Sequence, residues 1–249
     1  MNTLELGILF PAFLAGLLVL ATHIPFGMRV LQRGVIFADI AVAQIAGLGV
    51  IIAELLDLGA QPLLVQLVAA TSALCGAALL AWIERGAPEV KEACIGLTFV
   101  LAASLGILLM SRDVHAGEHL KDLLVGQILW VSNTQLIATA LLTGALLAIW
   151  KGLRQRLGNF GFYALFALAV TASVQLVGIY LVFASLIVPA LATHRHPQRR
   201  YLYAFAVGIA GYVLGLLLSV RFDLPAGAAI VWALMLCGTA AALLKYSPP

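Results

Sequence analysis

The sequence predicts an all-α membrane protein that crosses a bilayer about nine times. Two observations lead to this fold class. The composition is 63% hydrophobic and only 10% charged, whereas soluble domains average about 25% charged residues. The chain also divides into apolar stretches, most of which are close to the ~20 residues that a helix needs to span a bilayer core of about 30 Å. We therefore expect a single transmembrane domain that occupies residues 1–249.

The predicted spans follow one another with short connections. They lie at residues 8–27, 34–56, 62–83, 93–111, 134–150, 160–179, 180–193, 201–220 and 226–244. Lipid offers no partner for free backbone N–H and C=O groups, so we expect every span to be a helix. Pro25 and Gly27 are expected to close the first span, which has no basic segment before it and is interpreted as retained rather than as a signal peptide. In the eighth span Gly208, Gly211 and Gly215 form a small-residue seam suited to close helix packing.

Positive charges predict the orientation of the chain, because Lys and Arg concentrate in cytoplasmic loops. With the N-terminus outside, eleven of the fourteen Lys and Arg residues fall in inner loops and three in outer loops. The N-terminus is therefore predicted outside and the C-terminus in the cytoplasm. Residues 160–193 lie between two basic inner loops but provide only roughly 51 Å of helix, too little for two full crossings. We expect one helix of this pair to be short or broken, with Gly178 at the turn.

Asp39 is the residue that the apolar pattern explains least. It lies in GVIFADIAVAQIAGLGV (Gly34–Val50), a predicted span rich in small residues. An Asp at the centre of a spanning helix costs roughly 2.5–3.5 kcal/mol, so such residues usually face a protein interior or a water-filled path. Gln44 is a second polar residue in this span, but on a regular helix the two are about 140° apart. Asp39 is thus a candidate waypoint for an ion; alternatively, it caps the helix or pairs with Arg33 at the membrane boundary.

Several further residues are candidate ligands. Between the fourth and fifth spans, SRDVHAGEHLKDLLVGQILWVS concentrates His115, Glu118 and His119 on the predicted outer side. The two histidines would share a helix face, a spacing that suits weak capture of a transition metal; the alternative is a solvated loop that meets an external partner. His23, near the inner end of the first span, is another candidate, although a lone His is more often a hydrogen-bonded helix-end residue. Glu92 begins the fourth span, where a carboxylate complements the helix dipole.

The inner loop Lys151–Gly161, KGLRQRLGNFG, is basic and interrupted by glycines. No GxxxxGK[ST] phosphate-binding motif occurs in the sequence, so any ATP that drives the protein is expected to be hydrolysed in another chain. No set of nucleophile and base suggests an enzyme. Two functions remain open at this point: a transport subunit driven by a separate ATPase, and a self-sufficient secondary cation transporter in which Asp39 is the coupling site.

A family resemblance rests on four stretches of the chain. They are Arg33–Val50, Glu92–Leu109 (EACIGLTFVLAASLGILL), Leu123–Ser132 (LLVGQILWVS) and Val177–Ala192 (VGIYLVFASLIVPALA). In this order and spacing they resemble the permease subunit of bacterial ABC importers for zinc and manganese. More distantly, DLPAG (Asp223–Gly227) is similar to the turn before the last helix in permeases for cobalamin and iron siderophores.

The resemblance implies an assembly in the bacterial cytoplasmic membrane. Its expected parts are a homodimer of permeases, two cytoplasmic ABC ATPase subunits and an external metal-binding protein that docks near Arg112–Ser132. The transported substrate would be a divalent ion of the zinc or manganese class, with no intrinsic cofactor. The residues expected to contact the ATPase lie in the inner loop: Lys151, Arg154, Arg156 and Gly158.

The resemblance also implies that Asp39 is a metal ligand, because it matches the Asp of the family's second span. The family's His four residues later is absent here. The matching position is Ala43, or Gln44 if one residue is inserted. We therefore take Asp39 and Gln44 as the candidate pair, and an amide oxygen in place of an imidazole favours harder ions than zinc.

Overall fold

The computed structural model describes residues 3–59, 61–111, 124, 126–153, 156–194 and 199–243. Within these ranges the chain forms nine α-helices and one short 3-10 helix, η1 (Ile128–Trp130). The α-helices are α1 (Thr3–Arg33), α2 (Ala38–Leu55), α3 (Pro62–Gly86), α4 (Lys91–Met110), α6 (Asn133–Leu153), α7 (Asn159–Val177), α8 (Ile179–Ala192), α9 (Arg200–Phe222) and α10 (Ala226–Leu243). Eight of them are long and apolar enough to cross a membrane, and α8 is shorter. The predicted all-α fold is confirmed.

The turn expected at Gly178 is present. α7 ends at Val177 and α8 begins at Ile179, and Gly178 between them has φ 80° and ψ 163°. A residue with a side chain rarely adopts this conformation, so the glycine allows the chain to break between two apolar helices. The sequence predicted that one helix of this pair is short, because residues 160–193 are too few for two full crossings. With 14 residues, α8 is that short helix.

Pro25 and Gly27 do not end the first helix, which corrects the expectation from the sequence. α1 continues through both residues to Arg33, and Gly34, with φ 64°, follows its end. Pro25 removes one backbone donor inside the helix, a loss that membrane helices tolerate. Gly27 has a packing role, because a Cβ atom at this position would collide with the backbone carbonyl of Leu186 in α8.

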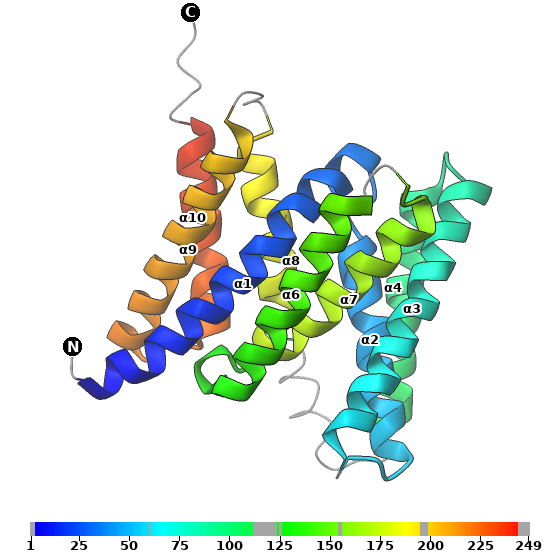
Figure 1. Cartoon of the computed structure of the whole chain (residues 1–249), viewed down its shortest axis with the longest axis horizontal. Helices are drawn as coiled ribbons and strands as arrows, with labels where there is room; N and C mark the ends of the chain where they lie inside the picture. Colours follow the sequence, from blue (N-terminus) through cyan, green and yellow to red (C-terminus); the bar gives the residue numbers. More distant parts are fainter. Residues whose placement is uncertain are drawn as a thin grey trace, which may run out of the picture. The chain divides into compact units, whose positions relative to one another are not determined.

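The described residues divide into two compact units. The first unit contains Met1–Arg33, Leu124–Ala145 and Ser173–Pro249, and the second contains Gly34–Leu123 and Leu146–Ala172. In the first unit α9 packs along α10, and α1 packs against α8 and α9 (Figure 1). A buried hydrogen bond of 2.9 Å between the Ser185 and Tyr212 hydroxyl groups joins α8 to α9.

The glycine seam expected in the eighth predicted span lies in α9, in the core of the first unit. A Cβ at Gly208 would lie 2.7 Å from the Leu20 side chain of α1, and one at Gly211 would lie 2.9 Å from the Cα of Leu234 in α10. A Cβ at Gly215 would likewise lie 2.7 Å from the Ile230 side chain of α10. The seam therefore serves close packing within the chain, one of the uses expected of small residues in membrane helices.

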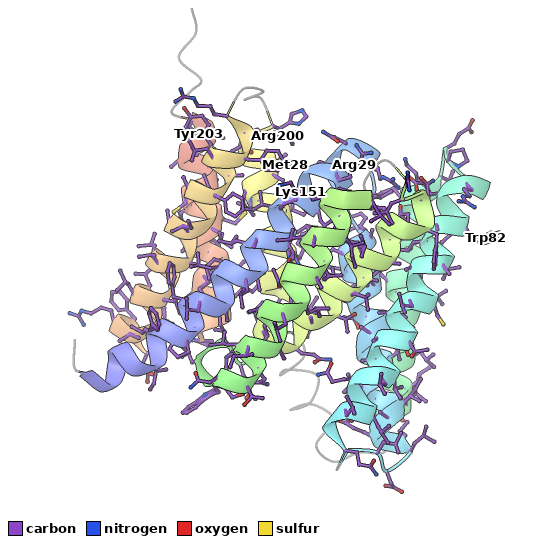
Figure 2. All side chains as sticks on the ribbon, in the orientation of Figure 1. Met28, Arg29, Trp82, Lys151, Arg200 and Tyr203 are labelled. Atoms are coloured by element: carbon purple, nitrogen blue, oxygen red, sulfur yellow. The ribbon has the colours of Figure 1, made fainter. Side chains whose placement is uncertain are left out.

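Basic residues gather at one end of the first unit. Arg29, near the end of α1, and Arg200, at the start of α9, both lie there (Figure 2). The Arg200 side chain donates a 3.4 Å hydrogen bond to the Ala190 carbonyl near the end of α8. This arrangement agrees with the expectation that the loops after α1 and before α9 share one side of the membrane.

In the second unit α2 packs against α3 and α4, which Figure 1 shows as neighbouring ribbons. Small residues bring these helices together. A Cβ at Gly49 of α2 would lie 2.8 Å from the Cα of Ala69 and 2.9 Å from the Cβ of Ser72 in α3, and one at Gly76 of α3 would lie 2.8 Å from the Ile45 side chain. The small-residue pattern of α2 thus corresponds to close helix approach, as the sequence predicted.

Candidate functional site

The candidate site begins at the N-terminal end of α2, where the carboxylate of Asp39 is buried. Asp39 lies in the first turn of the helix and is only 1% exposed. Neither of its carboxylate oxygens has a hydrogen-bond partner among the described residues. The N-cap position belongs to Phe37, whose own side chain makes no capping hydrogen bond. A helix N-terminus favours a negative charge, but this placement still leaves both oxygens of Asp39 available to a ligand.

α2 is continuous from Ala38 to Leu55, and this regularity decides which residues share a face with Asp39. Ala43 lies one turn further along on the same face and is 1% exposed. Gln44 is half-buried and points about 140° away from Asp39, as a regular helix requires. The proposed joint binding of an ion by Asp39 and Gln44 stays a prediction.

Glu92 is linked to the same helix end, a feature that the sequence analysis missed. It lies in the first turn of α4, as expected for a carboxylate that complements a helix dipole. In addition, its Oε1 atom accepts a 3.0 Å hydrogen bond from the backbone N–H of Phe37. Its Oε2 atom is buried and has no hydrogen-bond partner among the described residues.

His23 is buried inside α1 rather than at a helix end, because α1 continues for ten further residues to Arg33. Its Nδ1 atom lies 3.0 Å from the Val19 carbonyl oxygen and 2.9 Å from the Thr22 hydroxyl oxygen. A carbonyl oxygen only accepts, so Nδ1 carries the proton and Nε2 the lone pair. Nε2 is buried without a hydrogen-bond partner in the described part of the chain.

The remaining candidate ligands fall elsewhere. His115, Glu118 and His119 lie outside the described residues, as does Arg154 of the inner loop. Within the described ranges no group of three or more His, Cys, Asp or Glu side chains is arranged to hold a metal ion.

An aromatic cluster lies beside the inner loop, which runs from Lys151 at the end of α6 to the start of α7. The ring of Phe162 lies 5.8 Å from Trp150 of α6 and stacks on Phe166 of α7 at 5.8 Å, while Tyr163 meets it edge-on at 5.3 Å. Phe162, Tyr163 and Phe166 are all buried. The last turn of α6 and the first turns of α7 are thus joined by ring packing.

Exposed residues of the inner loop include Lys151, Arg156 and Gly158. A Cβ at Gly158 would meet nothing within 4 Å, whereas one at Gly161 would press on the Leu157 side chain. Lys151 is labelled in Figure 2 at the end of α6. The first carbon of a side chain added at Gly158 therefore meets no described atom of this chain.

Comparison with known proteins identifies the family. The sequence matches the ABC 3 transport family over residues 5–151 and 144–244. The chain is a member of this family. The solved structure described as PsaBC from Streptococcus pneumoniae in complex with Fab has the same fold, with a TM-score of 0.72 at 23% identity and coverage of 94% of this chain and 89% of that one.

Proteins similar in sequence to this chain include three that are named for different metals. The probable iron transport system membrane protein of Haemophilus influenzae is 28% identical over 163 residues, which cover 57% of this chain and 60% of that protein. The high-affinity zinc uptake system membrane protein ZnuB of Haemophilus influenzae is 24% identical over 246 residues, with coverage of 90% and 92%. The manganese transport system membrane protein MntC of Halalkalibacterium halodurans is 29% identical over 175 residues, with coverage of 61% and 60%. The chain spans 60% of the length of the iron and manganese relatives in these matches.

Proposed function

We propose that the chain is the membrane-spanning permease subunit of an ABC importer that moves a divalent transition-metal ion into a bacterial cell. Membership of the ABC 3 transport family supports this function, as do relatives named as membrane proteins of iron, zinc and manganese transport systems. The observation that carries the proposal is Asp39, a buried carboxylate without a hydrogen-bond partner among the described residues. A desolvated and unpaired carboxylate is costly, and a passing cation explains why the chain retains it.

The ligands of α2 favour a hard ion. Asp39 supplies carboxylate oxygen, and Ala43, which shares its face, supplies no ligand. Gln44 adds an amide oxygen about 140° around the helix, so joint binding with Asp39 requires a local distortion of α2. Oxygen ligands without imidazole suit manganese better than zinc. His115, Glu118 and His119 are assigned to initial capture of the ion beside an external metal-binding protein.

ATP would act on the chain from the cytoplasm through the inner loop. Lys151, Arg156 and Gly158, together with Arg154, form the surface assigned to the ATPase. Because Phe162 packs on Trp150, a force on this loop moves α6 and α7 together. The assembly contains a second copy of the chain, and the N-terminus of each copy lies outside the cytoplasmic membrane, with the C-terminus inside.

Reconstitution tests this function. The chain is co-expressed with a candidate ABC ATPase and purified through a tag on the chain. The complex is placed in liposomes with external ⁵⁴Mn²⁺ or ⁶⁵Zn²⁺ and a candidate metal-binding protein. We expect the ATPase to co-purify and uptake to require ATP. Uptake that proceeds without ATPase and follows a proton or sodium gradient would contradict the proposal and support a secondary transporter.

A further inference from the structure

α2 and α4 run parallel, so their N-terminal ends lie side by side. The two glycines of α4 that face α2 establish this direction. A Cβ at Gly96 would lie 4.0 Å from the Phe37 side chain, and one at Gly106 would lie 3.7 Å from Leu48 and 3.4 Å from Ile51. Parallel neighbours place the positive ends of two helix dipoles together, an arrangement that a shared anion stabilises.

Glu92 is that anion. It belongs to the first turn of α4, and its Oε1 atom accepts the Phe37 N–H of α2 at 3.0 Å. α2 has no cap of its own, because the side chain of Phe37 offers no acceptor and no capping side-chain bond is present. The carboxylate of a neighbouring helix therefore accepts the N-cap N–H, as the Glu or Gln of a capping box does within a single helix.

Glu92 and Asp39 lie on different sides of α2. Three residues of α2 are the nearest neighbours of the α4 glycines: Phe37, Leu48 and Ile51. On a regular helix these positions lie between about 120° and 180° from Asp39. Glu92 thus holds α2 from the side opposite to the Asp39 carboxylate, and any effect on the ion must pass through the backbone of the first turn.

We propose that Glu92 is a positioning residue for Asp39. Its hydrogen bond to the Phe37 amide, two residues before Asp39, fixes where the first turn of α2 lies along the helix axis and how it is rotated about that axis. Loss of the bond frees an uncapped helix end, and the Asp39 carboxylate then spends part of its time away from the place where the ion passes. This inference rests on the proposed function of Asp39 in metal transport.

The acceptor oxygen, rather than the charge, is the essential feature, and this distinction gives the test. Glu92→Gln keeps a side-chain carbonyl of the same length, whereas Glu92→Ala and Glu92→Met remove the acceptor. Glu89→Ala is the matched control, because Glu89 is an exposed carboxylate three residues before Glu92 in the chain. Each variant is reconstituted with the ATPase, and the rate of ⁵⁴Mn²⁺ uptake is measured against Mn²⁺ concentration.

We expect Glu92→Ala and Glu92→Met to raise the apparent KM for Mn²⁺ roughly tenfold, the size of a lost helix cap, with little change in the maximal rate. Glu92→Gln and Glu89→Ala should keep the wild-type KM. Hydrogen exchange of peptides that contain the Phe37 amide should be faster in the Ala and Met variants only. This second measurement needs only the folded chain, so it holds even for a variant that assembles poorly.

Two results would overturn the inference. One is a wild-type KM with wild-type exchange at the start of α2 in both Glu92→Ala and Glu92→Met. The other is a Glu92→Gln variant as impaired as Glu92→Ala, which would assign the effect to charge. If Asp39→Asn transports Mn²⁺ normally, the proposed function of Asp39 fails instead; if Asp39→Asn is inactive while Glu92→Ala is normal, only the positioning role fails.

Discussion

Phe162 provides a quantitative test of the contact between α6 and α7 beside the inner loop. Its ring is 1% exposed and lies within 6 Å of three other rings, those of Trp150, Tyr163 and Phe166. Truncation of a buried Phe to Ala costs about 3–5 kcal/mol. For a chain of this length that loss corresponds to a fall in Tm of roughly 10 °C.

The matched control is Phe160→Ala, because Phe160 lies two residues earlier in α7 and is 49% exposed. Its Tm should stay within a few degrees of the wild type, since exposed substitutions change stability by about 0.5 kcal/mol or less. The assay is thermal unfolding of the purified chain in detergent, followed by the ratio of Mn²⁺ transported to ATP hydrolysed in liposomes. We expect Phe162→Ala to lower both Tm and this ratio. Equal Tm values for the two variants would refute the packing argument, and a lower Tm with an unchanged ratio would refute the role of the cluster in coupling.

Three further predictions concern topology, coupling and ion choice. Single cysteines are placed at Glu118 and Gln155 in a chain without its native cysteines. A membrane-impermeant reagent should label the cysteine at 118 in intact cells and the cysteine at 155 only after permeabilisation. Labelling of both in intact cells would contradict the predicted orientation. A Cβ at Gly158 meets nothing within 4 Å, so we expect Gly158→Trp to leave Tm unchanged but to abolish ATPase co-purification and uptake. Normal uptake would exclude this loop as the coupling contact. Ala43→His places an imidazole on the face of α2 that carries Asp39. We expect it to shift uptake from Mn²⁺ towards Zn²⁺ more strongly than Gln44→His does. An equal shift would show that α2 is not a regular helix in the working protein.

The helices were predictable because the bilayer imposes one length and one composition on every span. One helix within residues 160–193 was predicted to be short or broken from the distance between two basic loops, and α8 (Ile179–Ala192) is the short one. Gly178 was predictable as a turn because few other features interrupt that apolar run. These inferences use properties of single segments, which the sequence contains directly.

Features that depend on which helices pack together were not predictable. Pro25 and Gly27 look like a helix end in the sequence, but in the structure Gly27 is required by the backbone of Leu186 in α8. The hydrogen bond between Glu92 and the Phe37 amide requires that α2 and α4 run parallel at a fixed offset, and no local pattern encodes that offset. Asp39 was found from the sequence because a charge in an apolar span is anomalous on its own.

The most direct test of the account compares the same substitution at the two ends of α2. Asp39→Asn removes the buried charge, and Asp57→Asn removes an exposed one at a residue with φ 57°, a conformation that Asn accepts readily. ATP-driven ⁵⁴Mn²⁺ uptake is measured for both variants at equal levels of assembled complex. The account predicts that Asp39→Asn reduces uptake to background while Asp57→Asn transports at the wild-type rate. Equal uptake by the two variants would contradict the assignment of Asp39 to the ion path.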